Sequence, residues 1–145
     1  MNTKQNILVT GATGFLGGHL VERLICEGYG VDFIARDKIK AKPLMQLGES
    51  FIHQDLSTKF SLNKKYDAVY HCAALSKPWG KYENFYSANM LATLNLVNAM
   101  QESGSDFLIH ISSPSIYFNF KDRFNIKETD PLGSKFVNHY VETKK

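Results

Sequence analysis

The stretch NILVTGATGFLG spans residues 6–17 and combines three local signals. It begins with an apolar, β-branched run at residues 6–10, which predicts a strand. A G-x-x-G-x-x-G turn follows at residues 11–17, and apolar residues recur at helical spacing over residues 15–27. This order of strand, glycine turn and helix is typical of the first unit of a βαβ sheet protein.

A different steric requirement explains each glycine of the turn. Gly11 allows the tight turn out of the strand, Gly14 lets the backbone approach a pyrophosphate, and Gly17 lets the helix pack against the sheet. The start of the helix offers free N–H groups and the positive end of its dipole to phosphate. No G-x-x-x-x-G-K-[ST] sequence is present, which favours a dinucleotide over ATP or GTP; a purely structural turn is the alternative.

The rest of the chain continues the alternation of strands and helices. Further strands are predicted at residues 31–35, 51–53, 67–72 and 107–111, and further helices at 39–47, 82–102 and from 136 onward. The run at 107–111 is nearly all apolar, which is typical of a strand buried on both faces. We therefore expect one α/β domain with a doubly wound parallel sheet, since 145 residues suit a single domain.

Composition argues against several classes of protein. The formal charge is only +3, and no stripe of basic residues interleaved with aromatics suggests a nucleic-acid partner. No run of about 18 apolar residues predicts a membrane span, and the N-terminus lacks the pattern of a signal peptide. Cys26 and Cys72 lie in apolar segments without metal-ligand spacing, so we expect two reduced, buried thiols, no metal site and a cytoplasmic protein.

The end of the second predicted strand bears on the choice of dinucleotide. An NAD site usually places an acidic residue there for the ribose hydroxyls. This chain has Ala35 followed by Arg36, which leaves space and positive charge for a 2′-phosphate. We therefore expect NADP, with NAD as the alternative. Asp37 could still turn back toward the ribose, and Arg36 and Lys38 could be ordinary surface charges.

Two further motifs carry candidate chemistry. Tyr140 and Lys144 form a Y-x-x-x-K pair, and residues four apart share one face of a helix. The lysine charge favours ionisation of the tyrosine hydroxyl, which can exchange a proton with a carbonyl or alcohol oxygen. The segment ISSPSIY at residues 111–117 follows the last predicted strand, where a serine can bond a substrate oxygen. A surface helix and a plain serine turn are the alternative interpretations.

These motifs together resemble the extended short-chain dehydrogenase/reductase family, which includes sugar-nucleotide epimerases, dehydratases and 3β-hydroxysteroid dehydrogenases. The matching segments run in the family's order along the whole chain: TGATGFLG at 10–17, Asp55-Leu56, His71-Cys72-Ala73-Ala74, NMLATLN at 89–95, ISSPSIY at 111–117 and YVETK at 140–144. The resemblance implies a Rossmann-type fold and an NAD(P)-dependent enzyme that moves hydride between nicotinamide and a carbonyl or alcohol carbon.

The resemblance also implies catalytic roles. Ser113 would hold the substrate oxygen, with Ser115 as the rival. Tyr140 would be the acid/base, and Lys144 would bind the nicotinamide ribose and keep Tyr140 reactive.

Roles in cofactor binding follow from the same resemblance. Asp55 would accept a hydrogen bond from the adenine amino group, with Leu56 beside it, and Asn89 would brace the long helix near the site. The other implied cofactor contacts, besides Arg36, Tyr140 and Lys144, are Gly11, Gly14, Phe15, Leu16, Gly17, Ala73, Ala74 and Leu75.

Fewer residues of the sequence bear on the class of substrate than on the cofactor. Phe118 stands where sugar epimerases usually keep Gly, and with Phe120 it adds apolar surface, which favours a 3β-hydroxysteroid dehydrogenase-like reductase of a lipid-like ketone or alcohol. Packing of these two rings in the core is the alternative interpretation. A nucleotide-sugar epimerase or dehydratase and a non-catalytic dinucleotide-binding fragment are the alternatives.

Family members continue past Y-x-x-x-K and often form dimers. We therefore expect residues 1–145 to be an incomplete Rossmann domain, truncated before its last strands and without the C-terminal substrate domain, and a homodimer is a further expectation.

Overall fold

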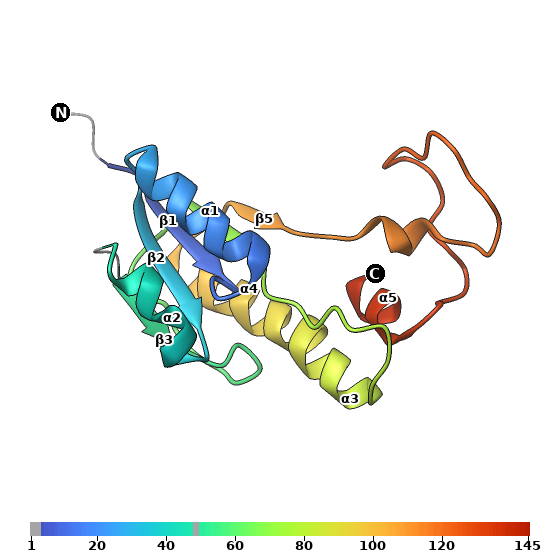
Figure 1. Cartoon of the computed structure of the whole chain (residues 1–145), viewed down its shortest axis with the longest axis horizontal. Coiled ribbons are helices and arrows are strands. Elements are labelled where there is room, and N and C mark those ends of the chain that lie inside the picture. The colour runs from blue at the N-terminus through green and yellow to red at the C-terminus, as the bar shows by residue number, and fades with distance from the viewer. Residues whose placement is uncertain (1–3, 48–49) are drawn as a thin grey trace.

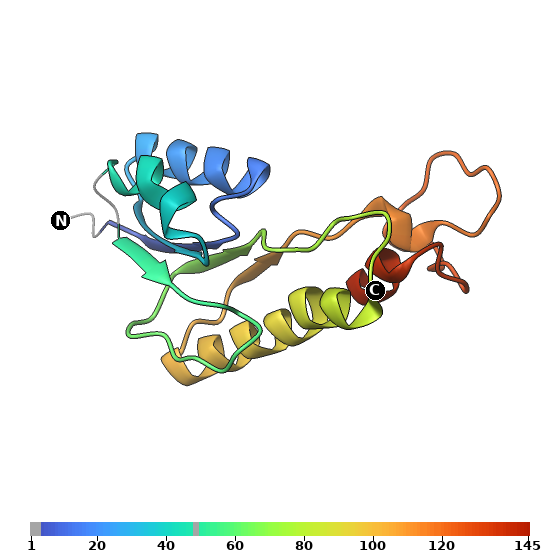
Figure 2. The same cartoon turned by 60° about the horizontal axis from the view of Figure 1, so that its bottom comes forward.

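The fold is a parallel sheet with helices on both faces (Figures 1 and 2). The computed structural model describes residues 4–47 and 50–145. Within these ranges one sheet has the strand order β3-β2-β1-β4-β5, and all neighbouring strands are parallel. The strands are β1 (Asn6–Thr10), β2 (Gly30–Ala35), β3 (Ser50–His53), β4 (Ala68–His71) and β5 (Leu108–His110). The predicted α/β sheet is thus confirmed.

Two sets of helices enclose the sheet. α1 (Phe15–Cys26) and α2 (Lys38–Met45) lie on one face, and a longer helical segment crosses the other (Figure 2). That segment consists of α3 (Tyr82–Phe85), the π-helical η1 (Tyr86–Leu91) and α4 (Ala92–Ser103). Because β2 and β4 lie on opposite sides of β1, the winding reverses between β1 and β4. Open α/β sheets bind their ligands in the crevice at such a reversal.

Alternate residues of the strands divide the core into two layers. Ile7 and Val9 of β1 belong to the same buried cluster as Val21 of α1. Leu8 points to the opposite face and joins the cluster that contains Leu96 of α4. Each buried aliphatic side chain contributes about 1.5–3 kcal/mol of hydrophobic free energy. The central strand β1 is therefore packed on both faces, and the glycine turn follows directly from this well-packed strand.

The structure corrects three expectations. The helix predicted at residues 82–102 is interrupted by the π-helical η1. The strand predicted as buried on both faces is half-buried or exposed, because β5 lies at the edge of the described sheet and pairs on one side only. Cys26 is exposed rather than buried, and Cys72 is only partly buried, although both are free thiols.

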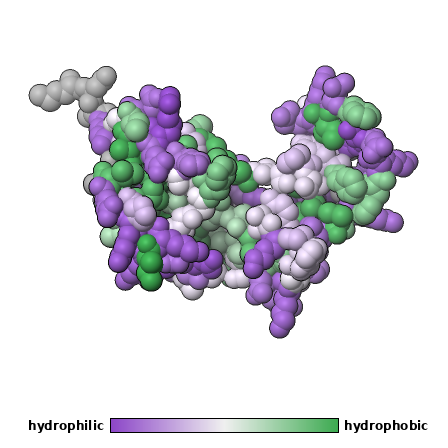
Figure 3. Space-filling view, viewed as in Figure 1, coloured by the Kyte–Doolittle hydropathy of each residue, from purple (hydrophilic) through white to green (hydrophobic). Residues whose placement is uncertain are grey.

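The last part of the chain extends away from the sheet (Figure 1). After β5 an extended segment leads to the short 3₁₀ helix η2 (Pro114–Tyr117), and α5 (His139–Lys144) then packs against α3 and η1. Arg123 organises the intervening loop by donating to Tyr117 O and pairing with Asp130 at 3.2 Å. The space-filling view shows a hollow between the sheet and this part of the chain (Figure 3).

Among the described residues, no helix is both long and apolar enough to cross a membrane.

Candidate functional site

The segments predicted to form the site gather at the carboxyl edge of the sheet. Asp55 follows β3, Arg36 follows β2, and the glycine turn follows β1. Residues 72–75 follow β4, and residues 111–113 follow β5. Because all strands run in the same direction, the strand order sets these five segments side by side along one edge.

The turn between β1 and α1 leaves room for a ligand but none for side chains. Gly11 has a φ of +69°, and a Cβ there would lie 2.6 Å from Ala73 N. A Cβ on Gly17 would collide with the carbonyl oxygen of Gly11. Gly14 precedes α1, and no side chain caps that helix. The first N–H groups of α1 are therefore free to bind an anion, and a pyrophosphate fits this turn.

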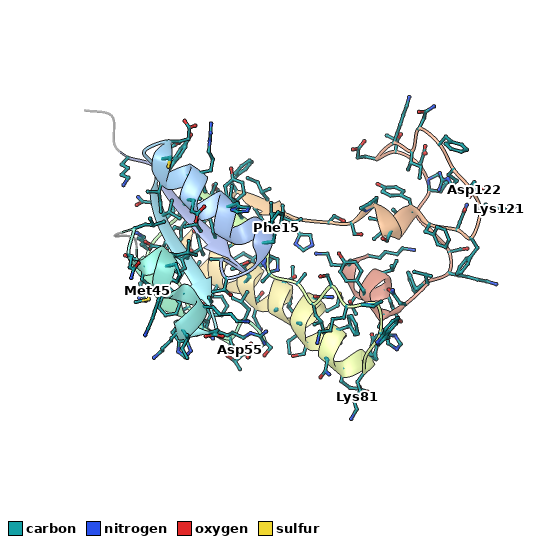
Figure 4. All side chains as sticks on the ribbon, in the orientation of Figure 1. Phe15, Met45, Asp55, Lys81, Lys121 and Asp122 are labelled. Carbon is teal, nitrogen blue, oxygen red and sulfur yellow. The ribbon has the colours of Figure 1, made fainter. Side chains whose placement is uncertain are left out.

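An open pocket with a volume of about 290 Å³ lies between this turn and α5. Eight residues predicted from the sequence line it, namely Gly11, Gly14, Phe15, Leu16, Gly17, Ala74, Tyr140 and Lys144. Phe15 lies at the start of α1, and its side chain is largely exposed (Figure 4). Residues from the two ends of the sequence therefore line one pocket.

α5 is held in place by two asparagines. Asn138 caps the helix by accepting a hydrogen bond from Val141 N at 3.0 Å, so the helix begins at residue 139 instead of the predicted 136. Asn89 of η1 is buried, and its Nδ2 donates to Thr143 Oγ1 at 2.9 Å. Its Oδ1 accepts from Leu75 N at 2.8 Å. Asn89 thus ties α5 to the segment after β4.

Lys144 reaches the end of β5 from α5. Its Nζ donates to Ile111 O at 2.6 Å and lies 3.1 Å from His110 Nε2. Burial lowers the pKa of Lys144 below its ordinary value. No carboxylate in residues 4–47 or 50–145 forms an ion pair with this ammonium group. An ammonium has three donors, so one N–H remains for the pocket.

His71 occupies the centre of a buried chain of hydrogen bonds. Thr93 Oγ1 donates to Asn89 O, so it must accept from His71 Nε2 at 2.9 Å. His71 Nδ1 then accepts from Thr10 Oγ1 at 2.7 Å, and Thr10 Oγ1 accepts from Ala73 N at 3.4 Å. Burial, with the charges of His110 and Lys144, lowers the pKa of His71 to about 3. The imidazole is therefore neutral and links β1, β4 and the helical segment.

The adjacent serines Ser112 and Ser113 lie in different environments. Ser112 lines the pocket, whereas Ser113 caps η2 by accepting a hydrogen bond from Ser115 N at 3.3 Å. Accepting that bond leaves the Ser113 hydroxyl proton free to be donated elsewhere. Ser115 is the first residue after Pro114 in η2 and does not line the pocket.

Arg36 and Asp55 lie together beyond the other side of the glycine turn. Arg36 Nη1 is 3.9 Å from Asp55 Oδ2, and both side chains are largely exposed. The Ser57 N–H, which donates to Asp55, holds the pKa of that carboxyl below its usual value, and the Arg36 charge acts in the same direction. Asp55 is labelled in Figure 4. Leu56 is a buried core residue instead, and only its backbone carbonyl bonds another side chain, that of Asn95.

The side chain of Asp37 stabilises the start of α2. Its Oδ1 accepts from Ile39 N at 2.9 Å and from Lys40 N at 3.1 Å, and so caps α2. It therefore points into the start of α2, and the end of β2 keeps Ala35 and Arg36.

The sequence motifs assigned no role to several residues in and near the site. Cys72, Ser76, Ile111 and Ser112 also line the pocket. His71 was visible in the HCAA motif, but its partners Thr10 and Thr93 are distant in sequence. Phe118 and Phe120 are exposed, with ring centroids 5.1 Å apart, so they do not pack in the core. Within the described residues, no three His, Cys, Asp or Glu side chains gather as a metal site requires.

A parallel sheet with this strand order, and a glycine turn at the point of reversal, defines an α/β protein of the Rossmann type. The model of the NAD dependent epimerase/dehydratase family matches residues 7–144, and the chain belongs to this family. The extended short-chain dehydrogenase/reductase resemblance is thereby confirmed.

Individual relatives extend the comparison. The uncharacterized protein YbjS of Escherichia coli (strain K12) is 36% identical over 143 residues, which cover 95% of this chain and 42% of that protein. The human sterol-4-alpha-carboxylate 3-dehydrogenase, decarboxylating, is 33% identical over 99% of this chain and 38% of its own length. The crystal structure of UDP-glucuronic acid 4-epimerase from Bacillus cereus, in complex with NAD, superposes with a TM-score of 0.73 at 29% identity and covers 97% of this chain and 49% of its own. The chain thus spans less than half the length of these relatives.

Proposed function

We propose that the pocket binds a nicotinamide dinucleotide and serves an oxidoreductase that transfers hydride to or from a carbonyl or alcohol carbon. One observation carries the proposal: Tyr140 and Lys144 line the same pocket as the glycine turn, although they come from opposite ends of the sequence. The matching family is NAD dependent, and a relative at 33% identity is a sterol dehydrogenase. The whole protein's activity is part of this proposal, because the chain covers under half of its relatives.

The role of each residue in the pocket follows from its position. The uncapped start of α1 binds the pyrophosphate, and Lys144 orients the ribose with its remaining N–H. The nicotinamide, when bound, supplies or accepts the hydride. Tyr140 exchanges the proton with the substrate oxygen, and a serine hydroxyl holds that oxygen. Ser113 keeps a free donor and remains the first choice, while Ser112, which lines the pocket, is the rival.

Replacing Tyr140 by Phe tests the catalytic role, because only the hydroxyl is lost. The assay follows NADPH absorbance while the chain is offered a panel of ketones, including lipid-like ones. We expect Tyr140→Phe to lower the turnover rate by about 10²–10⁴-fold, with unchanged affinity for NADPH. Equal turnover by the variant would exclude Tyr140 as the acid/base. Ser112→Ala and Ser113→Ala, measured in parallel, decide between the two serines.

We further propose a preference for NADP over NAD. Because Asp37 caps α2, no acidic side chain at the end of β2 competes with a 2′-phosphate for Arg36. The Arg36 guanidinium is 73% exposed and touches Asp55 only at 3.9 Å, so it can turn toward a phosphate. The structure of the relative from Bacillus cereus contains NAD, which keeps NAD as the alternative.

Calorimetric titration with NADPH and NADH tests this preference. Arg36→Ala is expected to weaken NADPH binding about 10- to 100-fold, the scale of a charged hydrogen bond, and to leave NADH binding unchanged. Lys38→Ala is the matched control, since it removes a neighbouring positive charge at the start of α2. Equal affinities for both dinucleotides, or equal effects of the two substitutions, would contradict the preference.

A nucleotide-sugar epimerase or dehydratase is the second candidate. The epimerase structure that superposes on this chain favours it. Phe118 and Phe120 do not line the pocket, but their exposed rings favour the first candidate, because a lipid-like ketone that extends out of the pocket would contact them. Net oxidation of NADPH supports the reductase, whereas conversion of a UDP-sugar without net consumption supports the epimerase. Dinucleotide binding without either reaction is the outcome expected of a non-catalytic binding fragment.

A further inference from the structure

His110, the last residue of β5, meets Lys144 beside the pocket. The distance from Lys144 Nζ to His110 Nε2 is 3.1 Å, and Ile111 O accepts from the same Nζ at 2.6 Å. A charged ammonium group has no acceptor, so it must be the donor in both contacts. His110 Nε2 therefore has to be unprotonated, and the neutral ring carries its proton on Nδ1.

The groups around His110 offer nothing to balance a second positive charge. The His71 ring from β4 lies 5.2 Å away and is neutral, because burial lowers its pKa to about 3. Burial raises the pKa of the neighbouring Cys72 thiol, which keeps it uncharged. The charged Lys144 from α5 contacts His110, and among the described residues no carboxylate pairs with Lys144.

We propose that His110 is a positioning residue whose protonation state decides whether Lys144 points into the pocket. Neutral His110 and Ile111 O together hold the ammonium group at the end of β5. Protonated His110 has an N–H where the acceptor was, and the two cations repel each other. Because His110 is exposed, its ring can exchange its proton with solvent.

The direction of the pH effect follows from this contact. Burial and the Lys144 charge lower the pKa of His110, so the neutral form predominates at neutral pH and Lys144 is held. As the pH falls through that pKa, the ammonium group leaves its place. The consequence for dinucleotide affinity rests on the proposed function, whereas the link between His110 and Lys144 does not.

The first test is made without any dinucleotide. In a chain labelled with ¹³C at the lysine Cε, the Lys144 resonance is assigned by its loss in Lys144→Arg and followed from about pH 8 downward until the His110 imidazole is fully protonated, because the pKa of His110 lies below the ordinary histidine value. We expect it to shift with the same midpoint as the His110 imidazole. The step should vanish in His110→Gln, whose amide oxygen can still accept but does not titrate. The Lys64 resonance is the internal control, because Lys64 pairs with Asp32 on another part of the sheet.

The second test measures NADPH affinity at both ends of this pH range. Wild type should lose about fivefold or more on acidification, the lower limit of typical coupling between two binding events. His110→Gln should keep only the smaller loss that comes from protonation of the NADPH 2′-phosphate, whose second pKa is about 6. His110→Leu, which lacks an acceptor, should bind more weakly than wild type at the higher pH and show the same small loss. Backbone amide spectra show that each variant is folded.

The inference is overturned if the Lys144 resonance of wild type does not follow His110, or if His110→Gln shows the same step. If the resonance follows His110 but NADPH does not bind at either pH, the link stands and the proposed function fails. The two failures are therefore distinguishable.

Discussion

At the scale of single residues, His71 connects the site to the stability of the fold. Its neutral ring receives one hydrogen bond, from Thr10, and gives one, to Thr93. A protonated ring has two donors, so Thr10 Oγ1 would have to turn its own hydrogen away and accept from His71 Nδ1 while it also accepts from Ala73 N. Protonation therefore removes the hydrogen bond that Thr10 donates and places a charge in the buried chain that joins β1, β4 and the helical segment.

This arrangement predicts loss of stability in acid. The pKa of His71 is about 3 in the folded chain, against about 6.5 in the unfolded chain, so the unfolded state binds the proton first. Its contribution is fully present above about pH 6.5 and falls by about 1.4 kcal/mol per pH unit below it. Urea unfolding should thus show a loss of about 2 kcal/mol from this group between pH 6.5 and pH 5. An NMR titration in which the His71 imidazole protonates near pH 6 would contradict the prediction.

The two adjacent glycines of α1 provide a matched pair for the packing of the turn. A Cβ at Gly17 collides with Gly11 O, whereas a Cβ at Gly18 meets Ala12 O at 3.2 Å. We expect Gly17→Ala to lower the free energy of unfolding by about 1–3 kcal/mol through overpacking. For Gly18→Ala the gain in helix propensity, up to about 1 kcal/mol, offsets most of a milder contact. Denaturant unfolding measures both, and equal losses would show that the turn is not close-packed against α1.

At the scale of elements, the sequence predicts the strands and helices whose apolar residues recur at a regular spacing. It does not predict features that depend on contacts between residues distant in the sequence. The strand, turn and helix at residues 6–26 were predictable because alternation, glycine spacing and helical periodicity all agree there. The π-helical η1 was not, because its Asn89 is bonded to Leu75 and to Thr143, 54 residues later. The exposed β5 was misjudged, because apolar residues do not reveal whether a strand has one neighbour or two.

The candidate site shows the same division. Six of the eight predicted residues that line the pocket follow the carboxyl ends of β1 and β4, which the topology places side by side, and Tyr140 and Lys144 reach it from α5. The contact between His110 and Lys144 could not be predicted, because it depends on how α5 lies over β5. The capping roles of Asp37 and Ser113 likewise appear only in hydrogen-bond geometry, although both residue types are common N-caps.

α5 depends on its cap and on one buried bridge. It has only six residues, and a helix this short is not stable by itself. Asn138→Ala should lower the free energy of unfolding by about 1 kcal/mol, since it removes the bond to Val141 N. Asn138→Asp is the control, because aspartate is an equally good N-cap. Chemical denaturation measures both variants, and an equal loss in the two would show that the cap does not support α5.

At the scale of the whole molecule, the chain has a layered part and a loosely attached part. Residues 6–110 form the sheet with its two core layers, whereas residues 118–137 contain no helix or strand and extend outward (Figure 1). Several of the apolar side chains in that segment are exposed, among them Phe118, Phe120 and Phe124. The two parts meet mainly where α5 packs against α3 and η1 and where Lys144 reaches β5.

This division predicts unequal local stability. Amides of β1, β2 and β4 should exchange hydrogen most slowly, because both faces of these strands are buried. Amides of residues 118–130 should exchange fastest, and α5 should be intermediate. Native-state hydrogen exchange followed by mass spectrometry measures all three. Uniform protection along the chain would mean that residues 118–137 share the cooperative core.

The central claim is that the glycine turn and α5 form one dinucleotide site. The most direct measurement is an amide NMR titration of the chain with NADPH. The account predicts that resonances of Gly11 to Gly17 and of Tyr140 to Lys144 move together, with one common midpoint. Movement of the turn alone would mean that α5 is not part of the site. No movement in either segment of a folded chain would contradict the claim as a whole.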